Sequence, residues 1–434
     1  MKYIISTLGC KVNQYETQAM ETLLQSHGHE PAKAGELADA VIVNTCAVTA
    51  ESGRKSRQTI RRLREENPGA VIAVCGCYSQ LDPDEAEELG AKVIFGAADR
   101  TKLVEAVEKA VNEGESCRDI NAPFERRMFE KLPAGAVSGR TRAMLKIQDG
   151  CVNFCSYCII PYTRGPVRSM DLDTACAQAR ELEERGYREI VVTGIEIASW
   201  GADLPGKPGV VSLIEGICRA VPRLRVRLGS LEPRVVTEEF CRRLSALPNL
   251  CPQFHLSMQS GSDSVLRRMN RKYDTARFLE SVEALRRTFP GCAVTTDMIV
   301  AFPGETEEEF AEGLSFIRRC AFADMHIFPY SRRPGTAAEK LPGQHGNAVK
   351  EERSRRAIAV AEEMNRQYRE SLMGSVQQVL FETEEDGLWS GHAPNYIRVY
   401  SHGENLHNRI ENVLVTGLRA DGVVGQIQGK EEAL

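Results

Sequence analysis

The chain has 434 residues and 14 cysteines, and its formal net charge at pH 7 is −5. This length is enough for two or three domains with hydrophobic cores. No apolar run is long enough to cross a bilayer, and the negative charge balance excludes a generally basic nucleic-acid coat. Many cysteines without a credible secretion signal predict reduced thiols in a cytoplasmic protein that has no membrane partner.

Strand-like and helix-like segments alternate over residues 1–114. The pattern predicts strands at 3–8, 40–43, 70–74 and 92–95, and helices at 13–26 and 50–66. Alternation at this rhythm is typical of an α/β domain in which helices cover both faces of a parallel sheet.

Three cysteines follow three of these strands: Cys10 in "TLGCKVNQ", Cys46 in "NTCAVT" and Cys77 in "CGCYSQ". Loops that follow parallel strands emerge at one edge of the sheet, so we expect the three thiols to converge on a shared metal site. Three thiolates favour iron–sulfur chemistry, although their spacing leaves zinc with a distant fourth ligand open. Cys75 lies two residues before Cys77, at a strand end, and we expect it to be a packed side chain.

The second predicted helix is strongly basic over "GRKSRQTIRRLREE", residues 53–66. A charge run of this kind is usually a solvated helix face. Because the helix follows the Cys46 loop, contact with nucleic-acid phosphates is an equally good interpretation.

Residues 115–140 have little periodicity and contain several Pro and Gly, so we interpret them as a linker. The next part, residues 141–372, repeats a strand-then-helix unit. Its candidate strands lie at 144–148, 189–193, 225–229, 253–257, 294–300 and 325–329. Six such units predict a partial (β/α) barrel resembling a TIM barrel, whose working face is formed by the loops after the strands.

The motif "GCVNFCSYC" places Cys151, Cys155 and Cys158 just after the first strand of this barrel, at the spacing C-x3-C-x2-C. A structural zinc ion takes four ligands, whereas a 4Fe–4S cluster held by three cysteines keeps one iron free of protein ligands. That free iron is a position where chemistry can occur.

Polar residues recur after the other strands, as a rim that a small polar cofactor would require. The candidate cofactor-binding residues are Tyr157, Gly194, Glu196, Ser230, Glu232, Gln259 and Ser260. The segments "FPGET" (Pro303, Gly304) and "PYSRRPGT" (Tyr330, Arg332) occupy the same kind of position.

A helix is predicted at 348–373, with Asn347 placed to cap its start and Gly374 to close its end. Residues 373–434 then show short alternating runs separated by glycines, which is typical of a small antiparallel β-barrel. Tyr396, Arg398 and Tyr400 could contact RNA by stacking or pairing, although such residues are more often cross-strand packing pairs.

The C-x3-C-x2-C motif after the first strand of a partial barrel resembles the signature of radical S-adenosylmethionine enzymes. Together with "TLGCKVNQYET", "NTCAVT", "GCY", "LGSLEP", "QSGSD" and "FPGET", it is similar to the methylthiotransferase family over nearly the whole chain. The resemblance implies a 4Fe–4S cluster on Cys151, Cys155 and Cys158, which is the catalytic site, and S-adenosylmethionine on its open iron. It further implies a second 4Fe–4S cluster on the earlier cysteine trio and a C-terminal RNA-binding TRAM domain.

The implied reaction places sulfur and a methyl group on an aromatic carbon whose C–H bond resists ordinary nucleophiles. By the resemblance, the first cluster cleaves S-adenosylmethionine to a 5′-deoxyadenosyl radical that removes the hydrogen. The second would hold an exogenous sulfur that is methylated before transfer. Glu196 stands where this family branch often has His, and Ala301 where Gly is common, so the contacts of those loops are open.

The wording "LGCKVNQYET" most resembles the branch that acts on carbon two of threonylcarbamoyladenosine, next to the tRNA anticodon. The implied partners are the tRNA anticodon stem-loop, a sulfur donor and an electron-donor protein. The alternatives are methylthiolation of isopentenyladenosine in tRNA or of an aspartate in a ribosomal protein. A non-catalytic iron–sulfur or zinc module that binds RNA is a further alternative, but it would leave the polar rim without a use.

Overall fold

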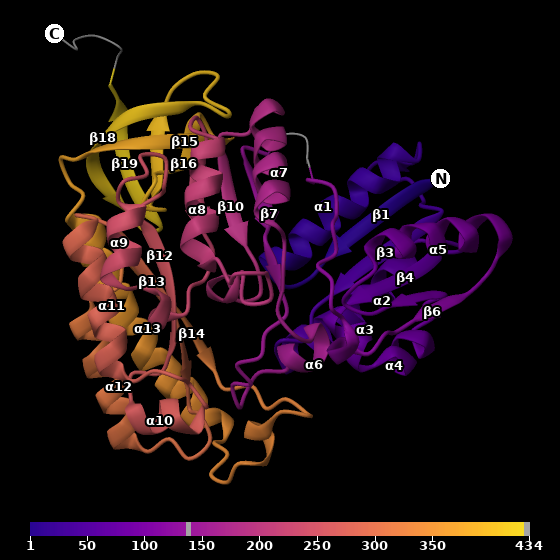
Figure 1. The fold of residues 1–434 in the computed structure, drawn as a ribbon, viewed down its shortest axis with the longest axis horizontal. Helices are drawn as coiled ribbons and strands as arrows, with labels where there is room; N and C mark the ends of the chain where they lie inside the picture. Colours follow the sequence, from indigo (N-terminus) through magenta and orange to yellow (C-terminus); the bar gives the residue numbers. More distant parts are fainter. Residues whose placement is uncertain (136–139, 429–434) are drawn as a thin grey trace.

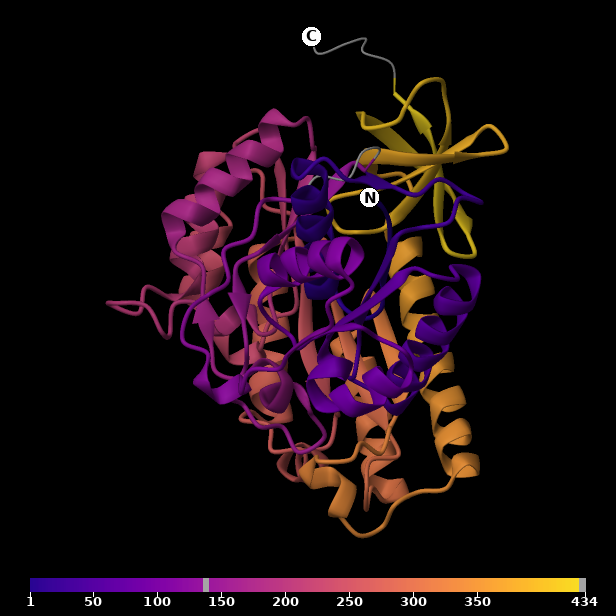
Figure 2. The same cartoon turned by 90° about the vertical axis from the view of Figure 1, so that its right-hand side faces the viewer.

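The computed structural model describes residues 1–135 and 140–428, which form an N-terminal α/β domain, a central partial barrel and a small C-terminal β-barrel. In Figure 1 the N-terminal domain lies beside the central barrel, and the yellow C-terminal barrel covers the end of the central barrel at which its strands begin. Seen from the N-terminal side in Figure 2, the indigo and purple domain lies in front of the barrel strands. The predicted fold class is confirmed.

The N-terminal domain contains one parallel sheet with strand order β2-β1-β3-β4-β5-β6. Its elements are β1 (Lys2–Thr7), α1 (Lys11–Ser26), β2 (Glu30–Pro31), β3 (Ala40–Thr45), α2 (Ala50–Glu66), β4 (Val71–Gly76), α3 (Cys77–Leu81), α4 (Pro83–Glu88), β5 (Val93–Phe95), α5 (Arg100–Glu113) and β6 (Cys117–Asp119). The strands and helices predicted in this region are present. Strands β2 and β6 were not predicted, and β6 lies within the stretch interpreted as a linker.

Helices cover both faces of this sheet because its strands are buried on both sides, as in other parallel sheets. On one face, α1 and α5 pack on the sheet through apolar side chains such as Met20 and Val104. On the other, α2, α3 and α4 pack through Ile60, Tyr78 and Ala86. Cys75 is fully buried in the first of these cores, as expected for a packed side chain.

The central barrel is built from two three-stranded parallel sheets, β7-β10-β11 and β12-β13-β14, which isolated bridges join at Val226–Leu250 and Leu231–Leu256. Its strands are β7 (Arg142–Lys146), β10 (Glu189–Thr193), β11 (Arg225–Leu228), β12 (Gln253–Gln259), β13 (Ala293–Val300) and β14 (Asp324–Pro329). A separate pair, β8 (Gln148–Asp149) and β9 (Arg168–Ser169), is antiparallel. The six predicted barrel strands are confirmed.

Helices follow the barrel strands and enclose a continuous apolar core. They are α6 (Ile160–Arg164), α7 (Leu172–Glu184), α8 (Gly209–Ala220), α9 (Glu238–Leu244), α10 (Asp263–Arg268), α11 (Thr275–Thr288), α12 (Glu307–Cys320) and α13 (Asn347–Glu370). Thr306 and Glu309 form a capping box that fixes the start of α12. Asn347 is the first residue of α13 and Gly346 precedes it as the cap, so the predicted Asn347 cap is wrong.

The C-terminal barrel closes from β15 (Val376–Glu385), β16 (Leu388–His392), β17 (Arg398–His402), β18 (Ile410–Arg419) and β19 (Gly422–Ile427). The predicted small β-barrel is confirmed; its pairings are antiparallel apart from the parallel pair β17–β19, so the barrel is mixed. The domain boundaries at 114, 140 and 372 stay predictions. Among the described residues, none of the helices is both long and apolar enough to span a membrane.

The C-terminal barrel is held against the central barrel by arginines that are half-buried or buried. Arg142 of β7 pairs with Glu382 of β15, with Nε 2.8 Å from Oε1. Arg225 of β11 donates to the Gln378 carbonyl at 2.6 Å. Burial raises the pKa of the Glu382 carboxyl, but the hydrogen bond from His392 and the charge of Arg142 outweigh it and lower that pKa to about 2.

Candidate active site

The first cysteine trio lies in the loop after β7 and β8, at the carboxyl end of the barrel strands. The three thiols of Cys151, Cys155 and Cys158 are half-buried and act electrostatically on one another. The loop is tight: Gly150 has φ +76°, and an added Cβ would lie 1.9 Å from the Pro166 carbonyl oxygen. The predicted trio therefore lies on one tight loop.

Burial favours the neutral form of these thiols. Burial raises the pKa of the Cys151 thiol to about 11 and that of Cys158 to about 12. Because thiolate is the form that binds metals, a buried set of three thiols needs a cation to become ionised. Within residues 1–135 and 140–428, no group of three His, Cys, Asp or Glu side chains is arranged to hold a metal ion. The ligand sets therefore stay predictions.

A polar rim surrounds the first trio. Burial raises the pKa of the Glu196 carboxyl to about 7 against the opposing charge of Arg271. The Arg271 guanidinium donates to Cys155 Sγ at 3.3 Å and to the Tyr273 hydroxyl at 2.8 Å. Tyr157 is partly buried beside the same guanidinium, and burial raises its pKa. Arg271 and Tyr273 were missed in the sequence because "MNRKYD" matches no motif of known chemistry.

The other rim residues have individual local roles. Gly194 packs on Gln148, since an added Cβ would lie 2.9 Å from the Gln148 Oε1. Glu232 is buried and accepts a hydrogen bond from Arg234 at 2.7 Å. Its negative charge contributes to the raised pKa of the Glu196 carboxyl. Ser230 is exposed at the end of β11. The cofactor-binding role of these residues stays a prediction.

Two more predicted residues end β12. Gln259 has φ +70°, at a register shift in the pairing of β12 with β13. Ser260 is buried, and its hydroxyl accepts a hydrogen bond from the Ser262 amide at 3.2 Å. In the later loops, Tyr330 is buried and Arg332 is exposed.

The second cysteine trio lies at the carboxyl edge of the N-terminal sheet, as the topology predicts. Cys10 is exposed, Cys46 and Cys77 are buried, and Cys10 interacts electrostatically with both. The glycines that precede two of them bring the loops into contact. An added Cβ at Gly9 (φ +108°) would lie 2.8 Å from Cys46 Cβ, and one at Gly76 (φ +105°) would lie 2.4 Å from the Thr45 carbonyl oxygen.

Arg333 reaches this second trio from the barrel. Its Nη1 donates to the Thr49 carbonyl at 3.3 Å, and it interacts electrostatically with Cys46 and Cys77. Burial lowers its pKa. The neighbouring Arg332, which was named in the sequence as a residue of the barrel rim, is exposed, and its role there stays a prediction.

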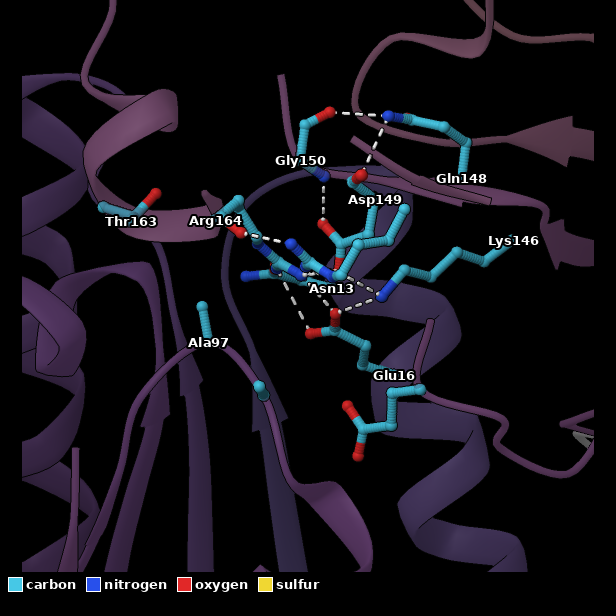
Figure 3. Close-up of polar contacts among 12 residues, drawn as sticks. Asn13, Glu16, Ala97, Lys146, Gln148, Asp149, Gly150, Thr163 and Arg164 are labelled. Carbon is cyan, nitrogen blue, oxygen red and sulfur yellow. Dashed lines mark hydrogen bonds and ion pairs between the residues drawn. The ribbon is translucent and has the colours of Figure 1, made fainter. Parts of the chain in front are cut away.

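A buried ionic network joins the two cysteine-bearing loops (Figure 3). At its centre, the fully buried Glu16 of α1 contacts Arg164 of α6, and it lies 2.9 Å from both Lys146 Nζ and Arg100 Nη2. Lys146 Nζ also lies 2.8 Å from Asp149 Oδ2. Burial raises the pKa of Glu16, but the charges of Arg164, Lys146 and Arg100 outweigh it and hold that pKa well below its usual value.

Arg164 makes the connection between the two loops. Its Nη2 donates to Asn13 Oδ1 at 2.8 Å, and its Nη1 lies 3.2 Å from Asp149 Oδ2. Asn13 in turn donates to the Leu8 carbonyl at 2.7 Å, in the loop that carries Cys10. Asp149 lies two residues before Cys151 and accepts from the Gly150 amide at 2.8 Å.

The basic side chains of α2 and the ring of Tyr400, which the sequence offered as RNA contacts, mostly contact other residues of the protein. On α2, Arg54 pairs with Glu51 and Arg62 with Glu66, in agreement with a solvated helix face. The Tyr400 ring lies 4.9 Å from the Arg398 guanidinium and 4.2 Å from that of Arg419. These guanidinium groups would compete with a base for stacking on Tyr400.

Comparison with known proteins places the chain in a family. The radical SAM superfamily model matches residues 145–317, and the model of uncharacterized protein family UPF0004 matches residues 2–96. The chain is 38% identical to the threonylcarbamoyladenosine tRNA methylthiotransferase MtaB of Bacillus subtilis (strain 168), over 94% of this chain and 92% of the relative. The chain belongs to the radical SAM methylthiotransferase family.

A second relative lies in another branch of this family. The tRNA-2-methylthio-N(6)-dimethylallyladenosine synthase of Pelotomaculum thermopropionicum is 31% identical, over 98% of this chain and 97% of the relative. Among solved structures, the radical S-adenosylmethionine methyltransferase TsrM from Kitasatospora setae has a TM-score of 0.58 at 15% identity, over 90% of this chain and 80% of that one. That likeness concerns the fold alone. Radical SAM membership implies S-adenosylmethionine and a 4Fe–4S cluster as cofactors.

Proposed function

We propose that this radical SAM enzyme adds a methylthio group to carbon two of threonylcarbamoyladenosine, next to the anticodon of tRNA in the cytoplasm. The observation that carries the proposal is full-length similarity, at 31–38% identity, to four relatives named as threonylcarbamoyladenosine tRNA methylthiotransferases. The convergence of two cysteine trios supports it, because the reaction has to supply both a radical and a sulfur.

We assign Cys151, Cys155 and Cys158 to the 4Fe–4S cluster, which when bound supplies the electron that cleaves S-adenosylmethionine. The rim around Glu196, Arg271 and Tyr157 would bind and orient the cofactor. We further propose a second 4Fe–4S cluster on the trio formed by Cys10 and its two partners. A sulfur donor, an electron-donor protein and an RNA-binding role for the C-terminal barrel belong to the same proposal.

Mass spectrometry of tRNA nucleosides from cells with and without the protein tests the substrate. The expected result is loss of the methylthio form of threonylcarbamoyladenosine in cells that lack it, and recovery when the gene is restored. Loss of methylthio-dimethylallyladenosine instead would contradict the proposal and favour the branch represented by the Pelotomaculum relative. Unchanged nucleosides together with an unmodified ribosomal aspartate would favour the protein substrate.

Single cysteine variants test the division of labour between the trios. We expect Cys151→Ala to abolish release of 5′-deoxyadenosine, and Cys46→Ala to retain release while blocking the methylthio product. Cys75→Ala is the matched control, because Cys75 is a buried thiol beside the second trio that packs in the sheet core. A Cys46→Ala protein that still forms methylthio product would contradict the assignment of the second trio.

A further inference from the structure

A cavity of about 450 Å³ lies where the three parts of the chain meet, outside the two cysteine trios. This volume is within the range typical of small-molecule sites. The N-terminal helix α1, the barrel strands β7, β10 and β11, and the C-terminal barrel all contribute to its wall. The polar residues that matter for its chemistry are Lys11, Arg140, Arg142, Arg227, Glu382 and Tyr396.

The cationic side chains of this cavity outnumber its carboxylates. Arg142 is neutralised by Glu382, with Nε 2.8 Å from Oε1, and Arg227 by Glu189, with Nε 2.7 Å from Oε1. The Lys11 ammonium has no hydrogen bond or ion pair to any described residue, and the same holds for the Arg140 side chain within those ranges. Arg140 acts electrostatically on the Glu21 carboxylate, which leaves Lys11 as the cation of this cavity without a close carboxylate among the described residues.

Lys11 is the cation of this cavity that is placed to bind an anion. The residue is exposed overall, but burial of its ammonium, together with the positive charges of Arg227 and Arg142, lowers the pKa of Lys11 against the opposing effect of the Tyr396 hydroxyl. The one carboxylate among its electrostatic partners, Asp297 of β13, lies 3.3 Å from His255 and is shared with that ring. An anion that binds here would therefore not have to break an existing hydrogen bond or ion pair of the Lys11 ammonium.

Tyr396 lines the cavity, and neighbouring side chains already contact its ring. Its ring stacks on His392 with centroids 4.8 Å apart, and the Arg227 guanidinium lies 4.7 Å from the ring centroid. The basic side chains of its lining make the cavity suited to a negatively charged group. An apolar group placed here would strip water from Lys11 without replacing its hydrogen bonds, which is unfavourable.

The cavity includes the first turn of α1, where Lys11 directly follows Cys10 of the second trio and Gln14 lies one helical turn farther along. A substrate group bound by Lys11 would extend from a nucleoside whose reacting carbon lies near the sulfur-bearing site. This placement links recognition of the substrate's side chain to the loop that would deliver the sulfur.

We propose that this cavity binds the carboxylate of the threonylcarbamoyl group, with Lys11 as the residue that selects it over uncharged adenosine modifications. The inference rests on the proposed function and adds the residue that sets its specificity. The threonylcarbamoyl group ends in a free carboxylate, which can accept charge-assisted hydrogen bonds from an ammonium. A dimethylallyl group offers Lys11 neither charge nor acceptor, so the same cavity rejects it.

The test compares two anticodon stem-loop RNAs that differ in one group: threonylcarbamoyladenosine with its free carboxylate, and the same nucleoside with the carboxylate converted to an uncharged amide. Affinities are measured anaerobically by fluorescence anisotropy on the full-length, iron-loaded protein. We expect the wild type to bind the carboxylate RNA at least about tenfold more tightly than the amide RNA, as one charge-assisted contact allows. Lys11→Met should weaken binding of the carboxylate RNA alone and reduce the ratio to below about twofold.

Two further variants keep the test interpretable. Lys11→Arg retains the cation and should retain the preference, whereas Lys102→Met removes an exposed lysine of α5 and should leave both affinities unchanged. Iron content is measured for each protein, so that a disturbed Cys10 loop is recognised. Equal weakening of both RNAs by Lys11→Met would mean that Lys11 contacts a backbone phosphate, and would overturn the inference, as would equal wild-type affinity for both RNAs.

The proposed function is tested separately by the product that the wild type forms. If the wild type methylthiolates the threonylcarbamoyl RNA but Lys11→Met keeps the preference for carboxylate, the inference alone fails. If the wild type methylthiolates only a dimethylallyl RNA, the proposed function fails whatever Lys11 does.

Discussion

Replacing Arg164 by Gln tests whether buried charge holds the N-terminal domain on the barrel. Arg164 is fully buried and contacts Glu16, Asp149 and Asn13, so the substitution removes the only guanidinium that touches all three among the described residues. Its partner Glu16 lies 148 positions earlier in the chain. The loss of these interactions should therefore weaken the packing of the N-terminal domain on the barrel.

The size of the effect follows from what remains after the substitution. Removing one member of a buried ion pair typically costs about 3–5 kcal/mol, because the other charge is left uncompensated. After Arg164→Gln, Glu16 keeps Arg100 and Lys146, each at 2.9 Å, so we expect the lower end, about 3 kcal/mol. Glu16→Gln leaves three buried cations without their shared carboxylate, and we expect about 5 kcal/mol.

Urea unfolding followed by circular dichroism measures these losses. The control is Arg62→Gln, which breaks an exposed pair with Glu66 at 2.8 Å and should cost less than about 1 kcal/mol. The reasoning is refuted if Arg164→Gln costs no more than this control, or if Glu16→Gln costs less than Arg164→Gln.

The pH dependence of the same network has a definite sign. Because the folded-state pKa of Glu16 is depressed, its contribution is present above the unfolded-state pKa of about 4.3 and is lost as pH falls toward the folded-state value. The stability difference between wild type and Glu16→Gln should therefore be constant from about pH 6 to 8. A difference that shrinks within this window would show that Glu16 titrates there.

Three further predictions concern single positions. Because the pKa of Glu382 is about 2, Glu382→Gln should cost about 3 kcal/mol at pH 7 and lose that effect only in acid, as read from unfolding curves between pH 3 and 8. Gly9→Ala should lower iron content by disturbing the second trio, whereas Gly28→Ala, also at positive φ but with open space around it, should not. Ala301 has φ +55°, so Ala301→Gly should raise the unfolding free energy by about 0.5–1 kcal/mol; a decrease would contradict strain at that position.

The sequence was sufficient to predict most of the fold because its regular elements are long and strongly patterned. The helix predicted at 50–66 matches α2 (Ala50–Glu66), which Thr49 caps at its start. Strands β2 and β6 were missed because they have two and three residues and no apolar pattern of their own. They are strands only because the edges of an existing sheet offer them hydrogen-bond partners.

The candidate site was predictable where local sequence determines position and unpredictable where distant partners do. A cysteine that directly follows a strand of a parallel sheet lies in a loop at one edge of that sheet, so the shared location of Cys10, Cys46 and Cys77 followed from topology. Arg271 and Lys11 carry no such signal. Each is an ordinary basic residue in sequence, and its significance depends on groups that only the folded chain places beside it, such as Cys155 Sγ at 3.3 Å from Arg271.

The ionic network also explains how two cysteine-bearing loops from separate domains keep one relative position. An apolar contact between α1 and β7 can shift by a fraction of a turn at small cost, because dispersion has little directional preference. A guanidinium that bonds Asn13, Glu16 and Asp149 cannot shift without leaving a buried charge unpaired, which costs several kcal/mol. Asn13 lies three residues after Cys10 and Asp149 two residues before Cys151, so this constraint acts directly on both loops. The ion pairs beside the two cysteine-bearing loops thus restrain the position of one trio relative to the other. Substitutions at Arg164 should therefore change this relative position before they change the arrangement within either trio.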